Sequence, residues 1–163
     1  MSKKLSRKAK RKQGISRCLN VIEDLDDSYW LKDRIGEWHL YVIGVFQNNL
    51  PKYAYVGITT NLERRLSEHK ESKGDFTLLE SINLGNMTYQ EAEKYEDAYY
   101  ILFRRNKVKV SGSHFGITPI KRATLGTMMA QGYFPKPEPN KNIQRWIKAC
   151  KKLEKNRKEC RKA

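Results

Sequence analysis

The sequence predicts an α+β domain, in which helices flank a small three-stranded antiparallel sheet, with a basic arm before it and a basic helix after it. Alternation of side chains over 38–46 and 53–58 predicts two strands joined by a turn. Two helix-capping patterns follow, and Lys and Arg crowd both ends of the chain. These observations together indicate one domain with two basic extensions.

Composition limits the class of protein. The chain has 163 residues and a formal net charge of +15, from 33 Lys and Arg against 18 Asp and Glu. That excess indicates a polyanionic partner. No apolar run reaches the roughly 18 residues of a membrane span, and no signal peptide is evident, so we expect a soluble cytoplasmic protein without a membrane partner. The three cysteines have no metal-ligand spacing and are expected to be reduced thiols.

The N-terminal part divides at a change of charge. Residues 1–18 form a basic arm with little apolar surface to bury, which we expect to be flexible and to contact nucleic acid. Residues 19–36 form a short helical lead-in, in which Ser28 is expected to cap a helix that continues through Ile35. Its acidic side chains suit a helix N-terminus better than a metal site.

The first two strands carry one tyrosine each on matching faces. Successive side chains of a strand point to opposite faces, so Tyr41 lies opposite Leu40 and Tyr55 lies opposite Ala54. Leu40 and Ala54 belong to the apolar face of each strand. The two phenols can therefore point the same way.

A helix is expected to follow the second strand. Thr60 and Glu63 match a capping box, which predicts a helix that begins at about Thr60 and ends before a turn over 71–74. On this helix Arg65 and His69 are four residues apart and share one face. The pattern brings two phenols, a guanidinium and an imidazole to the end of one hairpin.

The third strand and a second capped helix come next. The apolar residues within 75–84 predict a third strand that pairs with the hairpin, and the capping box of Thr88 and Glu91 predicts a helix to about Arg105. An apolar stripe at three- and four-residue steps marks its buried side: Ala92, Tyr95, Tyr99 and Leu102. Glu96 lies next to this stripe.

These residues resemble the GIY-YIG nuclease domain, over roughly 38–106. The resemblance rests on LYVIGV (Leu40–Val45), YVGIT (Tyr55–Thr59) and NLERRLSEHK (Asn61–Lys70). The first motif departs from the family, because its triplet is HLY here and the loop between the tyrosines is longer than usual. A longer loop costs little free energy.

The resemblance implies roles for individual side chains. In family order, the catalytic residues would be Tyr41, Tyr55, Arg65, His69 and Glu96. Glu96 would be the ligand of a Mg²⁺ or Mn²⁺ cofactor, with Glu91, Glu93 and Asp97 as competitors. The family also supplies an asparagine after this helix. Here Asn106, Ser113 or His114 takes that place, or it is unfilled.

The core is therefore expected over 37–116, and a basic helical extension over 117–163. The extension should contain a helix over 118–131, a proline-rich linker over 134–140 and a last helix with a basic outer face. We expect contacts with nucleic acid from six side chains: Arg64, Lys70, His114, Lys148, Lys151 and Lys152.

The predicted function is a metal-dependent endonuclease that hydrolyses phosphodiester bonds in DNA. The alternatives are a catalytically inactive protein that keeps the fold and binds DNA or RNA, and an ordinary basic RNA-binding protein. The sequence leaves open whether Tyr41 or His69 takes the proton, and whether the role is in homing, phage biology, restriction or repair. It also leaves open the oligomeric state.

Overall fold

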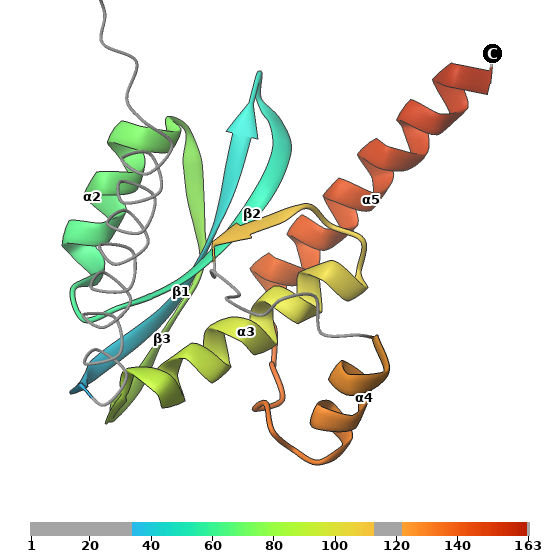
Figure 1. Ribbon diagram of the computed structural model, residues 1–163. Helices are drawn as coiled ribbons and strands as arrows, with labels where there is room; N and C mark the ends of the chain where they lie inside the picture. Colours follow the sequence, from blue (N-terminus) through green and yellow to red (C-terminus); the bar gives the residue numbers. More distant parts are fainter. Residues whose placement is uncertain (1–33, 113–121, 163) are drawn as a thin grey trace, which may run out of the picture. The chain divides into compact units, whose positions relative to one another are not determined.

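A four-stranded mixed sheet lies at the centre of the computed structural model, which describes residues 34–112 and 122–162 (Figure 1). The strands are β1 (Ile35–Gln47), β2 (Leu50–Thr59), β3 (Phe76–Thr88) and β4 (Val110–Gly112), in the order β3-β1-β2-β4. β1 pairs antiparallel with β2 and β3, whereas β4 pairs parallel with β2. The predicted three-stranded antiparallel sheet is corrected by this fourth strand, which is too short to produce a recognisable alternation.

Two layers of helix cover the sheet. The helices in the described ranges are α2 (Leu62–Lys73), α3 (Tyr89–Arg105), α4 (Arg122–Ala130) and α5 (Lys141–Lys162). α2 lies on one face of the sheet, and α3 and α5 lie on the other (Figure 1). None of the helices in this part of the chain is long and apolar enough to cross a membrane.

The two faces of the hairpin divide the core as the alternation predicted. Leu40 and Ala54 are fully buried in the larger apolar cluster, which contains Phe103 of α3 and Ile143 of α5. Tyr41 belongs to a second cluster on the other face, beneath α2. The other buried members of that second cluster are Ile43 and Val45, with Leu62 and Leu66 packed against them. Each face of the sheet is therefore covered by different helices.

The turn between β1 and β2 is shorter than the sequence suggested. It consists of Asn48 and Asn49, whose φ angles of 52° and 60° are those of a two-residue hairpin turn that asparagine tolerates. The extra residues between the two tyrosines therefore lengthen the paired strands and not the loop. One register shift, between Val45 and Phe46, accommodates them.

The predicted start of α2 is wrong by one residue. Asn61 caps the helix, and its side-chain oxygen accepts a hydrogen bond from the backbone N–H of Arg64 at 3.0 Å. Thr59 exchanges hydrogen bonds with Asn61 and fixes its backbone, so Thr60 does not form the predicted capping box. The helix continues to Lys73 and ends at Gly74, whose φ is 74°, so the predicted turn over 71–74 is mostly helical.

The capping box of α3 is confirmed. The Thr88 hydroxyl accepts from the Glu91 backbone at 3.2 Å, and the Glu91 carboxylate accepts from the Thr88 backbone at 2.9 Å. Before it, β3 extends four residues beyond the predicted end at 84, as far as Thr88. Ile35 starts β1 and does not end a helix.

Several predictions lie outside the described residues. They concern the basic arm over 1–18, the lead-in as far as residue 33, and the segment 113–121, which includes Ser113 and His114.

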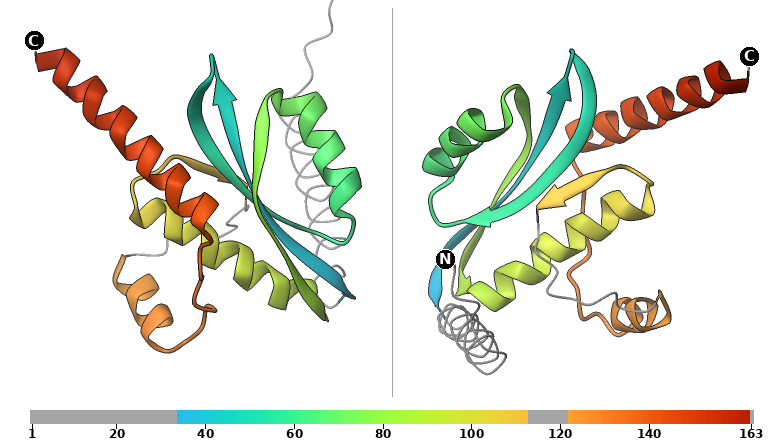
Figure 2. Two further views of the ribbon diagram at one scale, coloured as in Figure 1. Left: turned by 180° about the vertical axis from the view of Figure 1, so that it is seen from behind. Right: turned by 45° about the horizontal axis from the view of Figure 1, so that its top comes forward.

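The last helix is attached to the core by its first two turns. Ile143, Trp146 and Ile147 are buried, and Gly44 permits this contact because a Cβ there would lie 2.5 Å from the Trp146 ring. From Lys151 onward every described side chain is exposed except that of Leu153. In both views of Figure 2 this part of α5 extends away from the sheet.

Candidate active site

Tyr41 stands at the centre of the predicted site. Its side chain is fully buried, and it lies across the strand pair from Gly57. A Cβ on Gly57 would lie 2.4 Å from the phenol oxygen of Tyr41, so only glycine leaves room for the ring. Gly57, the glycine of the YVGIT segment, therefore leaves the space in which the Tyr41 ring packs.

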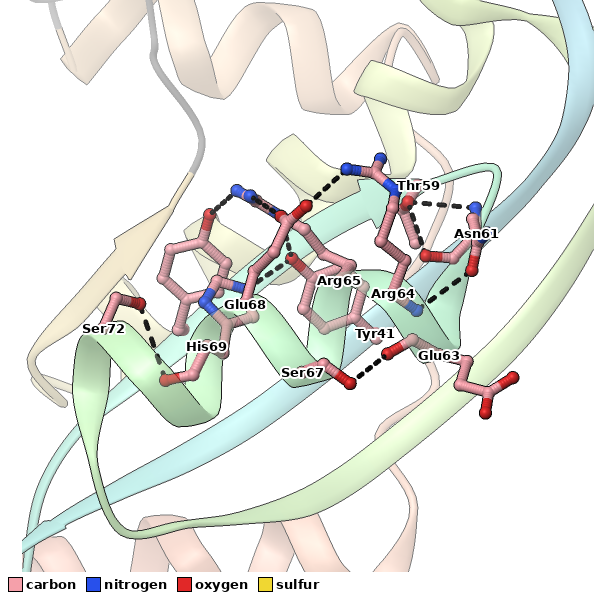
Figure 3. Close-up of polar contacts among 11 residues, drawn as sticks. Tyr41, Thr59, Asn61, Glu63, Arg64, Arg65, Ser67, Glu68, His69 and Ser72 are labelled. Atoms are coloured by element: carbon pink, nitrogen blue, oxygen red, sulfur yellow. Dashed lines mark hydrogen bonds and ion pairs between the residues drawn. The ribbon is translucent and has the colours of Figure 1, made fainter.

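α2 presents Arg65 and His69 to the two tyrosines, as their four-residue spacing predicted. Arg65 Nε donates to the Tyr41 hydroxyl and Arg65 Nη2 donates to the Tyr55 hydroxyl, both at 3.3 Å. His69 Nε2 lies 2.8 Å from the Tyr41 hydroxyl (Figure 3). One helix face therefore contacts both phenols.

Ring packing fixes the same four residues relative to one another. The Tyr41 and Tyr55 rings are stacked with centroids 6.1 Å apart, and the His69 ring meets the Tyr55 ring edge-on at 4.6 Å. His69 is only 2% exposed. A cluster packed this closely holds its polar atoms in place before any ligand arrives.

Glu68 orients the guanidinium. Its Oε2 accepts from Arg65 Nη1 at 2.8 Å, and its other carboxylate oxygen pairs with the exposed Arg64 (Figure 3). The hydrogen bond that Arg65 donates to Glu68 is the largest cause that raises the pKa of Arg65 above its usual value. Arg65 therefore stays charged at physiological pH.

The site holds His69 and Tyr41 in their neutral forms. Burial and the charges of Arg65 and Lys73 lower the pKa of His69 to about 4. Burial and the neighbouring Tyr55 raise the pKa of Tyr41 above its usual value, although Arg65 opposes this. At neutral pH a protonated phenol therefore faces a neutral imidazole, whose Nε2 accepts the phenol proton in the tautomer that carries its hydrogen on Nδ1.

A cavity of about 200 Å³ joins these side chains to α3. It is lined by Tyr41, Tyr55, Ile58, Arg65, Tyr89, Glu93, Glu96 and Gly112. Four of the five predicted catalytic residues line it, and the fifth, His69, contacts two of them. The walls come from β1, β2, β4, α2 and α3, so the folded chain is needed to assemble it.

Glu96 is a carboxylate that the protein has desolvated. It is 8% exposed, and burial together with the negative charges of Asp97 and Glu93 raises its pKa to about 8. A backbone hydrogen bond with Ile58 and the charge of Arg65 offset this in part. A cation in the cavity would be attracted to the same carboxylates that repel one another.

These residues fit a hydrated divalent cation. In the described ranges no three His, Cys, Asp or Glu side chains gather into a metal site. Glu96 and Glu93 line one cavity, however, and Mg²⁺ commonly binds one or two carboxylates and fills its other positions with water and phosphate oxygens. The donor set is therefore of the kind that this ion uses beside a phosphodiester.

Other predicted residues lie elsewhere. Asn106 does not line the cavity: it caps α3, and its side-chain oxygen accepts from Lys151 of α5 at 2.9 Å. Lys148 and Lys152 are exposed on α5, and Lys70 is exposed on α2. Asn106 therefore joins α3 to α5 and does not line the cavity.

The sequence analysis missed three side chains around the site. Tyr89 lines the cavity, Glu68 holds Arg65, and Lys73 lies with its Nζ 4.5 Å from the centre of the Tyr55 ring. Helical spacing was the available signal, because Tyr89 precedes Glu96 by seven residues and Lys73 follows His69 by four.

Comparison with known proteins identifies the domain. Residues 37–109 match the model of the GIY-YIG catalytic domain. The chain is 41% identical over 44 residues to the UPF0213 protein in the potE 3′ region of Serratia liquefaciens, a match that covers 27% of this chain and 39% of that relative. No solved structure matches the chain significantly. Residues 37–109 are therefore similar to the GIY-YIG catalytic domain.

Proposed function

We propose that this protein is a metal-dependent endonuclease that hydrolyses phosphodiester bonds in DNA. The observation that carries the proposal is the convergence of Tyr41, Tyr55, Arg65 and Glu96 on one cavity, with His69 bonded to Tyr41. Together they supply what phosphodiester hydrolysis needs: a proton acceptor, a cation for phosphate oxygens and a carboxylate. The nuclease character of the superfamily supports the same conclusion.

Tyr41 and His69 would act together on the attacking water. Arg65 donates to the Tyr41 oxygen, which leaves the phenol proton available to His69 Nε2 at 2.8 Å. As Tyr41 takes a proton from water, it passes its own proton to His69, so no phenolate accumulates. An anionic phosphate nearby offsets the charges of Arg65 and Lys73, two of the causes that depress the pKa of His69, and so strengthens this base.

Arg65 and Tyr55 would bind the phosphate. The guanidinium is permanently charged, and its contact with the Tyr55 hydroxyl at 3.3 Å aims it into the cavity. Glu96, with Glu93 beside it, would hold Mg²⁺ or Mn²⁺, which when bound supplies positive charge to phosphoryl and leaving oxygens. Glu68 keeps the guanidinium in this orientation.

The basic surfaces would hold the nucleic acid. α5 carries ten Lys and Arg residues against two Glu, and most of its length is exposed. Phosphate contacts from such a helix give affinity without base recognition. Lys148, Lys152, Lys70 and Arg64 are exposed and suited to this role.

The test is cleavage of supercoiled plasmid with Mg²⁺, Mn²⁺ or EDTA. We expect Arg65→Ala and Glu96→Gln to lower the cleavage rate by about 100-fold or more while DNA binding persists. Arg104→Ala and Glu71→Gln, which change exposed residues of α3 and α2, serve as matched controls and should cleave normally. Cleavage that survives both site substitutions would contradict the site.

Binding without turnover is the second candidate function. The engagement of Asn106 with Lys151 favours it, because that asparagine does not support the cavity. A protein of this kind would bind DNA or RNA with the same salt dependence. It would cleave neither DNA nor RNA in the presence of Mg²⁺ or Mn²⁺.

A further inference from the structure

Lys73 belongs to the same helix face as the site residues. It lies in the last turn of α2, four residues after His69 and eight after Arg65, and spacings of four place side chains one above another. Its Nζ lies 4.5 Å from the centre of the Tyr55 ring. The face that contacts the two tyrosines thus continues for two more turns beyond Arg65.

Tyr55 separates two cations. Arg65 Nη2 donates to its hydroxyl, and the Lys73 ammonium lies over its ring. None of the ion pairs among the described residues includes Lys73. Burial and the charge of Arg65 lower the pKa of Lys73. The ammonium is thus held near another cation without a carboxylate to balance it.

Two roles could account for this arrangement. A lysine at the end of a helix is favoured by the helix dipole, and an ammonium over a phenol ring is a stabilising contact. Neither role explains why a half-buried ammonium lies beside Arg65 at the edge of a proposed phosphate site. An anion at this position would be attracted by both cations.

We propose that Lys73 binds a second phosphate of the nucleic-acid strand, on the far side of Tyr55 from the phosphate bound by Arg65. This inference rests on the proposed function for the identity of the ligand. Lys73 contacts the ring and Arg65 contacts the hydroxyl of the same tyrosine, so the two phosphates that they bind lie close together on the strand. The second phosphate therefore belongs to a nucleotide within about two positions of the scissile phosphate.

Binding of a labelled DNA duplex, measured without metal between about 50 and 300 mM salt, tests Lys73 directly. Removal of one phosphate contact should make the slope of log K against log salt shallower by about 0.9 and weaken binding about five- to tenfold at physiological salt. We expect this for Lys73→Met, and near-normal binding for Lys73→Arg, which keeps the charge.

Lys94→Met is the matched control. Lys94 Nζ lies 4.6 Å from the centre of the Tyr133 ring, so its loss removes an equivalent ring contact and the same charge from a different surface. Its salt slope should equal that of the wild-type protein. A Lys73→Met slope equal to the wild-type slope would overturn the inference, with the melting temperature showing that the variant is folded.

Single methylphosphonate substitutions, each of which neutralises one phosphate of the DNA, locate the phosphate that Lys73 binds. In duplexes that carry one such group at successive positions around the mapped cut, wild-type binding should weaken at a position within about two nucleotides of the cut, on one side. Lys73→Met should be insensitive at that position only. An equal penalty in both proteins at every position would overturn the assignment.

The failure of this inference is distinguishable from that of the proposed function. Cleavage by the wild-type protein together with an unchanged Lys73→Met slope rejects only the Lys73 site. A shallower slope without cleavage in any metal supports the Lys73 contact and rejects the endonuclease. A wild-type protein that binds no duplex rejects both.

Discussion

At the residue scale, Gly57 packs directly against the phenol of Tyr41. A Cβ at Gly57 would lie 2.4 Å from that oxygen, and Tyr41 is fully buried, so the ring must move. We predict that Gly57→Ala lowers the free energy of unfolding by about 1–3 kcal/mol and abolishes cleavage, because movement of the ring breaks its contacts with Arg65 and His69.

The control for Gly57→Ala is Gly126→Ala. Nothing lies within 4 Å of a Cβ at Gly126 in α4, and alanine favours a helix over glycine by about 0.5–1 kcal/mol. Denaturant unfolding should therefore show equal or higher stability with unchanged cleavage. Normal cleavage by Gly57→Ala would show that the Tyr41 contacts are dispensable.

His69 gives a prediction for pH. Its pKa in the folded protein is about 4, below the roughly 6.5 of an unfolded histidine, so the unfolded chain binds the proton more tightly. The free energy of unfolding is therefore at its full value above pH 6.5. It falls by up to about 3 kcal/mol as the pH is lowered from 6.5 to 4. NMR titration of the His69 ring signal, which is assigned by its absence from the spectrum of His69→Gln, should give a midpoint well below pH 6. An ordinary midpoint would contradict the burial of this ring.

At the scale of the element, the start of α2 sets where Arg65 and His69 point. The Asn61 side chain accepts the Arg64 backbone N–H, and no described hydrogen bond involves Thr60. We predict that Asn61→Ala costs about 1 kcal/mol in urea unfolding, whereas Thr60→Ala costs little. The reverse order would restore Thr60 as the cap.

At the scale of the whole molecule, charge and core are separated along α5. Residues 154–162 carry five Lys and Arg against two Glu and are exposed, while Ile143, Trp146 and Ile147 attach the helix to the core. We predict that truncation after Leu153 leaves the melting temperature nearly unchanged. It should weaken DNA binding and make its salt dependence shallower, because several phosphate contacts are lost.

Two matched measurements check this prediction. Calorimetry of the truncated and full-length chains compares stability, and DNA titrations at several salt concentrations compare the slopes. Equal slopes would show that the free end of α5 does not contact DNA. Replacement of Trp146 by Ala, in contrast, should cost about 3–5 kcal/mol, because it empties the contact with Gly44 and Phe46.

Local chemistry explains how much of the fold and site could be predicted. Alternation placed Tyr41 and Tyr55 on one face, and helical spacing placed Arg65 and His69 together, because both periods are properties of the backbone. The cap of α2 was misassigned because Thr60 and Asn61 are both good caps, and the hydrogen bonds of Thr59 with Asn61 decided between them. β4 was missed because three residues show no period.

The sequence by itself determined the first three strands, the two capped helices and the side chains that share a face on them, since these follow from periods of two and 3.6 residues. Only the tertiary structure decided that Glu96 of α3 shares a cavity with Tyr41 and Arg65, and that Asn106 joins α5. The reason is physical: desolvation and electrostatic interactions depend on which side chains packing brings close together. The order of residues along the chain does not specify the distances between those side chains.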